Sequence, residues 1–197
     1  MGRFVRNLLL GLLPVLLPGC LPETRNPITP PEAAIEDDRL LGLWSARVED
    51  EDIFLHVLRA DNNQLAILVV SHRPDGRGGI DNYQGHVSAL GDRRFVNLRP
   101  VEDSTVDNSN PDLGYLIIGY DWDGPDRLVA RFLAEQPLVD AIAAGTLTGS
   151  VTDDGAGLGR DVMLTAESAQ LAAYLTAGDP AVIFDETLTF ERAPAPK

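Results

Sequence analysis

The chain has 197 residues, and its 30 acidic and 16 basic side chains give a formal net charge of −14. This acidity disfavours nucleic acid as a partner, because phosphates require a basic surface, and it disfavours peripheral binding to anionic lipid headgroups. Hydrophobic residues make up 44% of the chain, and a single cysteine is present. We therefore expect one soluble, monomeric domain that depends on its hydrophobic core, since no disulfide can form within the chain.

Residues 1–19 have the pattern of a secretory signal peptide. Arg3 and Arg6 provide a basic start, and an apolar run from Leu8 to Leu17 follows. This run is too short to span a bilayer, which takes about 20 apolar residues, and Pro14 interrupts it. The alternative is a buried N-terminal helix with a buried free cysteine. The proline-rich segment that follows at once disfavours that alternative, because proline does not continue a helix.

The tetrapeptide Leu17-Pro18-Gly19-Cys20 resembles the lipobox of bacterial lipoproteins. The resemblance implies cleavage before Cys20, diacylation of its sulfur and acylation of its new amino group. Several acyl chains anchor a protein stably, at about 0.8 kcal/mol per buried methylene. Leu21 stands where an aspartate tends to retain enteric lipoproteins in the inner membrane. The resemblance therefore implies an outer-membrane protein whose domain faces the periplasm.

The segment after the cysteine is rich in proline and charge, with Pro22, Pro27, Pro30 and Pro31. We predict that residues 20–38 form the lipidated cysteine and an extended, solvated tether. At about 3.1 Å per residue, such a tether would hold the domain some tens of ångströms from the bilayer. The domain is then expected over residues 39–193, with a short tail at 194–197.

Strand-like runs recur from Leu40 onward and are separated by turn residues. The run 93–99 alternates, with Phe95 and Asn97 on one face and Val96 and Leu98 on the other. Such alternation is typical of antiparallel sheets with two different faces. We predict strands over residues 43–49, 53–60, 64–71, 82–90, 93–99, 114–121 and 127–133, with polar loops at 73–79 and 101–110.

Helical spacing of apolar residues appears in the last third of the chain. One helix is predicted over 136–144, where Gly145 ends it, and a second over 166–177, where Thr165 is the candidate N-cap. Leu171, Tyr174 and Leu175 would face the sheet. Further strands are predicted over residues 146–151, 161–164 and 187–192.

This order of elements predicts a mainly β fold with two short helices, arranged as an antiparallel up-and-down β-barrel or half-barrel, since closure removes exposed strand edges. Gly42-Leu43-Trp44 at its start resembles the G-x-W motif of lipocalin-like barrels. The resemblance implies that Trp44 packs across the barrel base and that Arg192, on the last strand, lies over it. For Gly42, Trp44 and Arg192 it therefore implies a role in structural closure of the barrel.

The residue types that usually carry chemistry form no recognisable motif. His56, His72 and His86 lack metal-ligand spacing, and no nucleophile elbow surrounds a serine. A lipidated Cys20 would serve neither as a nucleophile nor as a zinc ligand. The glycine-rich stretch 155–159 follows two aspartates, which would repel a phosphate. We predict no cofactor and no catalytic residue.

Three aspartates in one predicted hairpin are the strongest candidates for a metal site. Asp121, Asp123 and Asp126 could hold calcium, which takes several carboxylate oxygens. Their spacing does not match an EF-hand loop, and Asp-Gly-Pro-Asp is equally typical of a plain turn. We predict the plain turn and no metal.

These observations predict a non-enzymatic, membrane-anchored lipoprotein that binds a small apolar ligand in its barrel or an envelope protein on its surface. The alternative is an inhibitor or immunity-type lipoprotein that blocks a periplasmic enzyme. A third hypothesis, a hydrolase, requires histidines that cluster with carboxylates in the folded chain. A dry apolar lumen would favour binding of the small ligand, and a filled core would favour a protein partner. An exposed apolar patch ringed by acids would favour the inhibitor.

Overall fold

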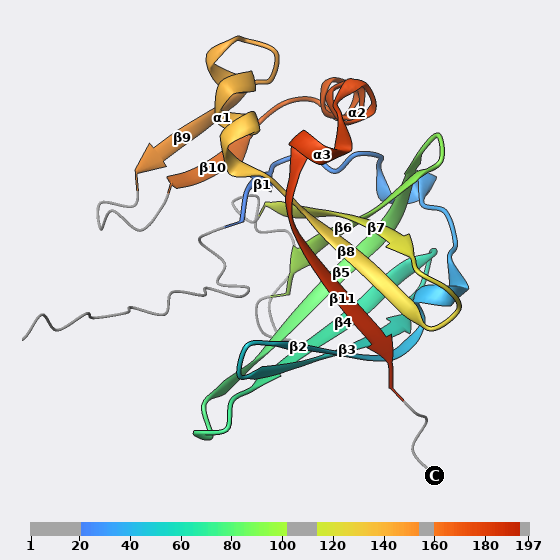
Figure 1. Ribbon diagram of the computed structural model, residues 1–197. Coiled ribbons are helices and arrows are strands. Elements are labelled where there is room, and N and C mark those ends of the chain that lie inside the picture. The colour runs from blue at the N-terminus through green and yellow to red at the C-terminus, as the bar shows by residue number, and fades with distance from the viewer. Residues whose placement is uncertain (1–20, 102–113, 154–159, 194–197) are drawn as a thin grey trace, which may run out of the picture.

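The computed structural model describes residues 21–101, 114–153 and 160–193. Cys20 and the signal-like residues before it, most of the predicted loop at 101–110, the glycine-rich stretch 155–159 and the tail lie outside these ranges. The described residues form a closed antiparallel β-barrel of eight strands, as the sequence predicts (Figure 1). Its strands are β2 (Gly42–Val48), β3 (Glu51–Arg59), β4 (Gln64–His72), β5 (Gly78–Leu90), β6 (Arg93–Pro100), β7 (Tyr115–Trp122), β8 (Arg127–Leu133) and β11 (Phe184–Arg192).

Successive strands of the barrel pair with their neighbours in the chain, and the pairing of β11 with β2 completes the ring. β6 pairs with β7, with Val96 opposite Ile118, and β11 pairs with β2, with Arg192 opposite Trp44. β11 also runs along most of β8. The barrel therefore has no free edge along its wall, which removes the usual hazard of edge-to-edge association.

The two ends of the barrel differ, and they lie on opposite sides in Figure 1. One end, here called the η2 end, carries the short 3-10 helix η2 (Asp38–Leu40) and the turn between β7 and β8. The other end, here called the β1 end, carries the short strand β1 (Glu23–Thr24) and the turns between β2 and β3 and between β4 and β5.

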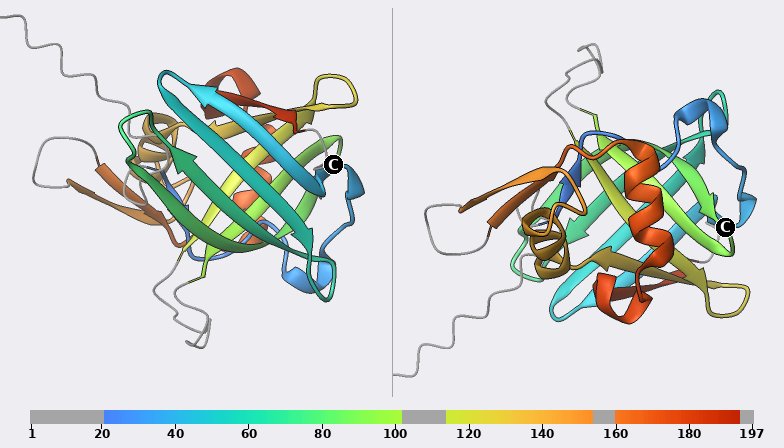
Figure 2. Two further views of the ribbon diagram at one scale, coloured as in Figure 1. Left: turned by 90° about the horizontal axis from the view of Figure 1, so that it is seen from below. Right: turned by 90° about the horizontal axis from the view of Figure 1, so that it is seen from above.

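An insertion between β8 and β11 forms a second layer outside the barrel. It contains α1 (Glu135–Ala143), β9 (Gly149–Asp153), β10 (Arg160–Leu164), α2 (Ser168–Ala177) and the short α3 (Pro180–Ile183). Seen from above, α2 lies across the outside of the barrel (Figure 2). Leu171 and Leu175 of α2 are fully buried in a cluster with Phe95 and Ile117, which point outward from β6 and β7. The barrel wall is therefore buried on both faces here.

The start of α2 differs from the predicted one. The helix begins at Ser168, and Glu167 occupies the N-cap position without a side-chain hydrogen bond. The backbone N–H of Thr165 instead donates to the carbonyl of Thr148, and Ala166 is fully buried. Thr165 is thus part of the connection from β10, and its prediction as the helix cap is wrong.

Residues 21–37, here called the strap, are packed against the barrel. β1 pairs with β7 on one side and with β10 on the other, and Ile28 and Thr24 are almost fully buried. Further along, Ile35 forms a β-bridge with Val87 of β5. The strap therefore differs from the solvated tether that its prolines predict. Pro30 and Pro31 fit because they lie at the start of the 3-10 helix η1 (Pro31–Ala33), where proline is tolerated.

None of the helices in the described ranges is long and apolar enough to cross a membrane.

Candidate functional site

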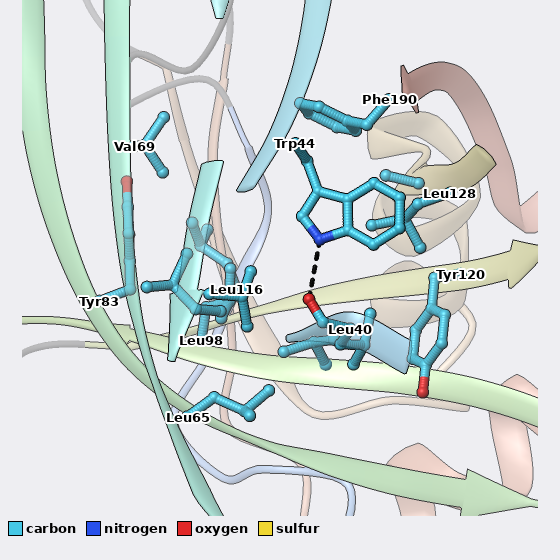
Figure 3. Close-up of a cluster of buried hydrophobic side chains, with 14 of the residues drawn as sticks. Leu40, Trp44, Leu65, Val69, Tyr83, Leu98, Leu116, Tyr120, Leu128 and Phe190 are labelled. Carbon is cyan, nitrogen blue, oxygen red and sulfur yellow. Dashed lines mark hydrogen bonds between the residues drawn. The ribbon is translucent and has the colours of Figure 1, made fainter. Parts of the chain in front are cut away.

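The interior of the barrel contains an apolar cavity of about 90 Å³. Its wall combines inward-facing residues of β3 to β8 and β11, because every second side chain of a strand points to the same face. Figure 3 shows side chains that lie in or beside this space and labels ten of them. The lining residues are Leu40, Leu55, Val57, Leu65, Ile67, Val69, Tyr83, Val96, Leu98, Leu116, Ile118, Tyr120, Leu128, Ala130, Phe132 and Phe190.

Two of the lining residues are tyrosines, Tyr83 and Tyr120, and the atoms that they present to the cavity are apolar. The Tyr120 hydroxyl donates a hydrogen bond to Oδ2 of Asp37 in the strap, at 2.9 Å. Burial, together with this bond to a carboxylate, raises the pKa of Tyr120. Burial and the nearby carboxylates of Asp81 and Glu23 also raise the pKa of Tyr83. Both phenols are therefore neutral at physiological pH, so the lining carries no charge.

Trp44 closes the η2 end of the barrel. Its side chain is fully buried, and its Nε1–H donates to the carbonyl of Leu40 at 2.8 Å (Figure 3). The guanidinium carbon of Arg192 lies 4.1 Å from the centroid of the Trp44 ring. The same guanidinium donates to the carbonyls of Leu41 and Arg39, at 3.0 and 2.8 Å. The structure thus brings Trp44 and Arg192 together in the arrangement that the resemblance implies.

Gly42 allows this close approach. Its φ of +124° is a conformation that L side chains rarely adopt, and a Cβ placed there would lie 3.0 Å from a guanidinium nitrogen of Arg192. A larger residue would therefore strain the backbone and displace Arg192 from the Trp44 ring.

A second cation–π pair stands beside the first, and the sequence analysis did not identify it. The Arg39 guanidinium lies 4.1 Å from the centroid of Trp122, and the rings of Trp122 and Trp44 are 5.6 Å apart. Each such pair contributes about 0.5–2 kcal/mol, depending on how far water is excluded. Arg39 comes from η2, so the helix and the first and last strands are joined at one place.

A buried polar cluster attaches the strap to the outer face of the barrel. Oδ1 of Asn97 accepts from the backbone N–H of Ile28 at 2.8 Å, and Nδ2 donates to Oγ of Ser88 at 2.8 Å. The Ser88 hydroxyl also lies 2.6 Å from that of Thr29, and Nε2 of His86 lies 2.7 Å from the Thr29 carbonyl. The side chains of Asn97, Ser88 and His86 are buried, so these bonds satisfy groups that water does not reach.

The buried His86 predicts a loss of stability in acid. Burial lowers its pKa, although the hydrogen bond to Thr29 offsets part of the effect. Its ordinary pKa is about 6.5, so the unfolded chain binds a proton there that the folded chain does not. Stability should therefore decline as pH falls below about 6.5, with a slope of at most about 1.4 kcal/mol per pH unit for this one group.

Urea unfolding at several pH values between 7.5 and 5 checks this expectation, with ~0.5-unit steps resolving the slope. The variant His86→Gln, which cannot titrate, should lose less stability over that range than the natural chain. His56→Gln is the matched control, because His56 is exposed on β3. Equal slopes for the natural chain and His86→Gln would contradict the prediction.

The remaining candidates from the sequence do not come together. His56 is exposed on the outer face of β3, His72 is exposed at the end of β4, and His86 lies beneath the strap. Within the described ranges, no three potential ligands converge to hold a metal ion. The three hairpin aspartates each bind a different arginine: Asp121 binds Arg131, Asp123 binds Arg127 and Asp126 binds Arg192.

Comparison with known proteins adds no relative from which function could be transferred: no family model, no curated protein and no solved structure matches this chain.

Proposed function

We propose that this protein is a lipid-anchored bacterial lipoprotein that binds a small apolar ligand in the lumen of its barrel, without catalysing a reaction. The observation that carries the proposal is the apolar, uncharged cavity of about 90 Å³ inside the barrel. A filled core would have favoured a role for the outer surface alone. Apolar cavities stay dry, so a ligand that enters this one displaces no well-bound water.

The size of the cavity limits the class of ligand. An apolar cavity of about 150 Å³ accommodates benzene in another small protein. At about 90 Å³ the lumen is smaller than that cavity, so it fits a short alkyl chain of a few carbons and not a ring or a long-chain lipid. The atoms that face the lumen are apolar, which suits an uncharged ligand, since a buried charge would have no counter-charge in the lining.

Propanol is a suitable probe of the lumen, because its short alkyl chain suits this volume. We expect it to raise the melting temperature and to change the fluorescence of Trp44, which packs against the lining. Saturation to about 100 times the Kd would stabilise the fold by about 2.7 kcal/mol. In Ala130→Leu the added atoms occupy the cavity, so binding should be lost while the chain remains folded.

Ala66→Leu is the matched control. It adds the same atoms on the exposed outer face of β4, where they leave the lumen unchanged. Propanol should therefore stabilise Ala66→Leu as much as the natural chain. Equal stabilisation of Ala130→Leu would place the binding site outside the lumen and contradict the proposal.

The proposed anchor is the lipid on Cys20, and it has a separate test. Mass spectrometry of the protein from bacterial envelopes should show a chain that begins at Cys20 and carries three acyl chains. Cys20→Ser should accumulate as an uncut, unlipidated precursor. Fractionation should place the natural protein in the outer membrane, facing the periplasm. A mature chain without lipid would contradict this part of the proposal.

A second candidate is the inhibitor or immunity-type lipoprotein, which an exposed apolar face would favour. Phe54, Leu58 and Ile80 are 38%, 50% and 67% exposed on the outer face of β3 and β5, opposite the insertion. Acids do not ring this face, because Arg47 lies there in an ion pair with Asp52. The outer face therefore supports a surface partner less well than the lumen supports a ligand.

A further inference from the structure

The first described residues of the chain continue the barrel wall at the β1 end. The last pair between β7 and β8 is Ile118 with Phe132, after which β8 leaves the barrel for α1. β1 takes over that side of β7, with Glu23 opposite Leu116. Leu21 precedes β1 and packs against the core cluster of the lumen. Because β1 runs antiparallel to β7, Leu21 lies beside Ile118, where it fills the notch that the departure of β8 leaves in the rim at this end.

The strap fixes this position firmly. β1 is held between β7 and β10, and the N–H of Arg25 donates to the carbonyl of Leu164 at 2.8 Å. Nδ2 of Asn26 donates to the carbonyl of Ala166, and the Ser168 hydroxyl donates to the carbonyl of Pro27. Because backbone and side-chain bonds hold residues 23–27 on both sides, Leu21 cannot move away from the rim without unfolding of the strap.

This geometry determines which end of the barrel faces the membrane when the protein is anchored through Cys20. Consecutive Cα atoms lie about 3.8 Å apart, so a lipid carried by the residue before Leu21 would be attached close to this rim. We propose that the β1 end of the barrel faces the bilayer surface directly, with the lipid on Cys20 at its rim. This inference rests on the proposed anchor. The η2 end, where Leu40 and Trp44 are buried, then points away from the membrane.

Energy transfer from single labels to acceptor lipids tests the orientation. The donor is placed on Asp75→Cys, in the turn between β4 and β5 at the β1 end, or on Asp61→Cys, in the turn between β3 and β4 at the η2 end. Both positions are exposed. In the lipidated protein the sulfur of Cys20 is blocked, so the added thiol is the one that reacts. The protein is purified in lipidated form and inserted into phosphatidylcholine vesicles.

We expect transfer from position 75 to be at least about twofold higher than from position 61, because a nine-residue strand such as β4 places them about 30 Å apart. Insertion of about 10 Gly and Ser residues between Cys20 and Leu21, with a mean span of about 17 Å, should remove most of this difference. Equal transfer from both positions, or higher transfer from position 61, would overturn the orientation and leave the anchor intact. If the protein purified from bacterial envelopes carried no lipid and did not bind vesicles, both the anchor and the orientation would be overturned.

Discussion

Replacement of Trp44 by alanine is expected to lower the free energy of unfolding by about 3–5 kcal/mol, the usual cost of removing a fully buried tryptophan. The side chain is 0% exposed and packs beneath Arg192 and beside Trp122. Its removal leaves a cavity and also ends the hydrogen bond to the Leu40 carbonyl. A domain of this kind is stable by about 5–15 kcal/mol, so the variant would be close to unfolding. Urea denaturation followed by circular dichroism measures the change.

Trp44→Phe separates the ring from the hydrogen bond. It keeps an aromatic surface under Arg192 but has no N–H for the Leu40 carbonyl. We expect it to lose about 1–3 kcal/mol, less than the alanine variant. If Trp44→Ala lost less than about 1 kcal/mol, the closure of the η2 end would not depend on this side chain, contrary to the prediction.

Replacement of Asn97 by alanine is expected to release the strap and to cost about 2–4 kcal/mol. The Asn97 amide is fully buried and binds the Ile28 N–H, the Ser88 hydroxyl and the His86 carbonyl. Alanine leaves these groups without their partner, and each unsatisfied buried group costs about 1–3 kcal/mol. Urea denaturation measures the cost. Hydrogen exchange should show faster exchange at the Ile28 amide, since the strap opens locally before the barrel does.

Asn82→Ala is the matched control for this prediction. Asn82 lies on the neighbouring strand β5, where its side chain is exposed to solvent. Its replacement should change the free energy of unfolding by no more than about 0.5 kcal/mol. Unchanged exchange at the Ile28 amide in Asn97→Ala would mean that other contacts hold the strap.

The barrel was predictable from the sequence because its strands alternate and its turns are short. The alternation from Phe95 to Leu98 gives the correct faces, although the structure buries both of them. The strap was not predictable in the same way. Ile28 is an isolated apolar residue among prolines and charges, and its burial depends on Asn97, which is 69 residues away in the chain. Local composition therefore indicated solvent where tertiary contacts bury the segment.

The candidate site was predictable only in part. The contact between Trp44 and Arg192 at the η2 end was predictable, because the resemblance of Gly42-Leu43-Trp44 to the G-x-W motif implies it. The lumen could not be derived in the same way, because a cavity is a small difference between the space that eight strands enclose and the volume of their side chains. The pairing of Arg39 with Trp122 depends on the path of η2, for which the sequence carries no local signal.

The joint between β2 and β11 has a consequence for how the chain folds. Only Ser45 and Trp44 of β2 are in register with β11, whereas β8 pairs with β11 along seven positions. The residues that meet there, Trp44 on the first strand of the barrel and Arg192 on the last, are far apart in the sequence. Contacts between such distant residues form slowly, because a long loop must close first. We therefore expect the ring to close last and slowly as the chain folds. Until Arg192 arrives, an open sheet with an apolar inner face is exposed to chaperones and to aggregation.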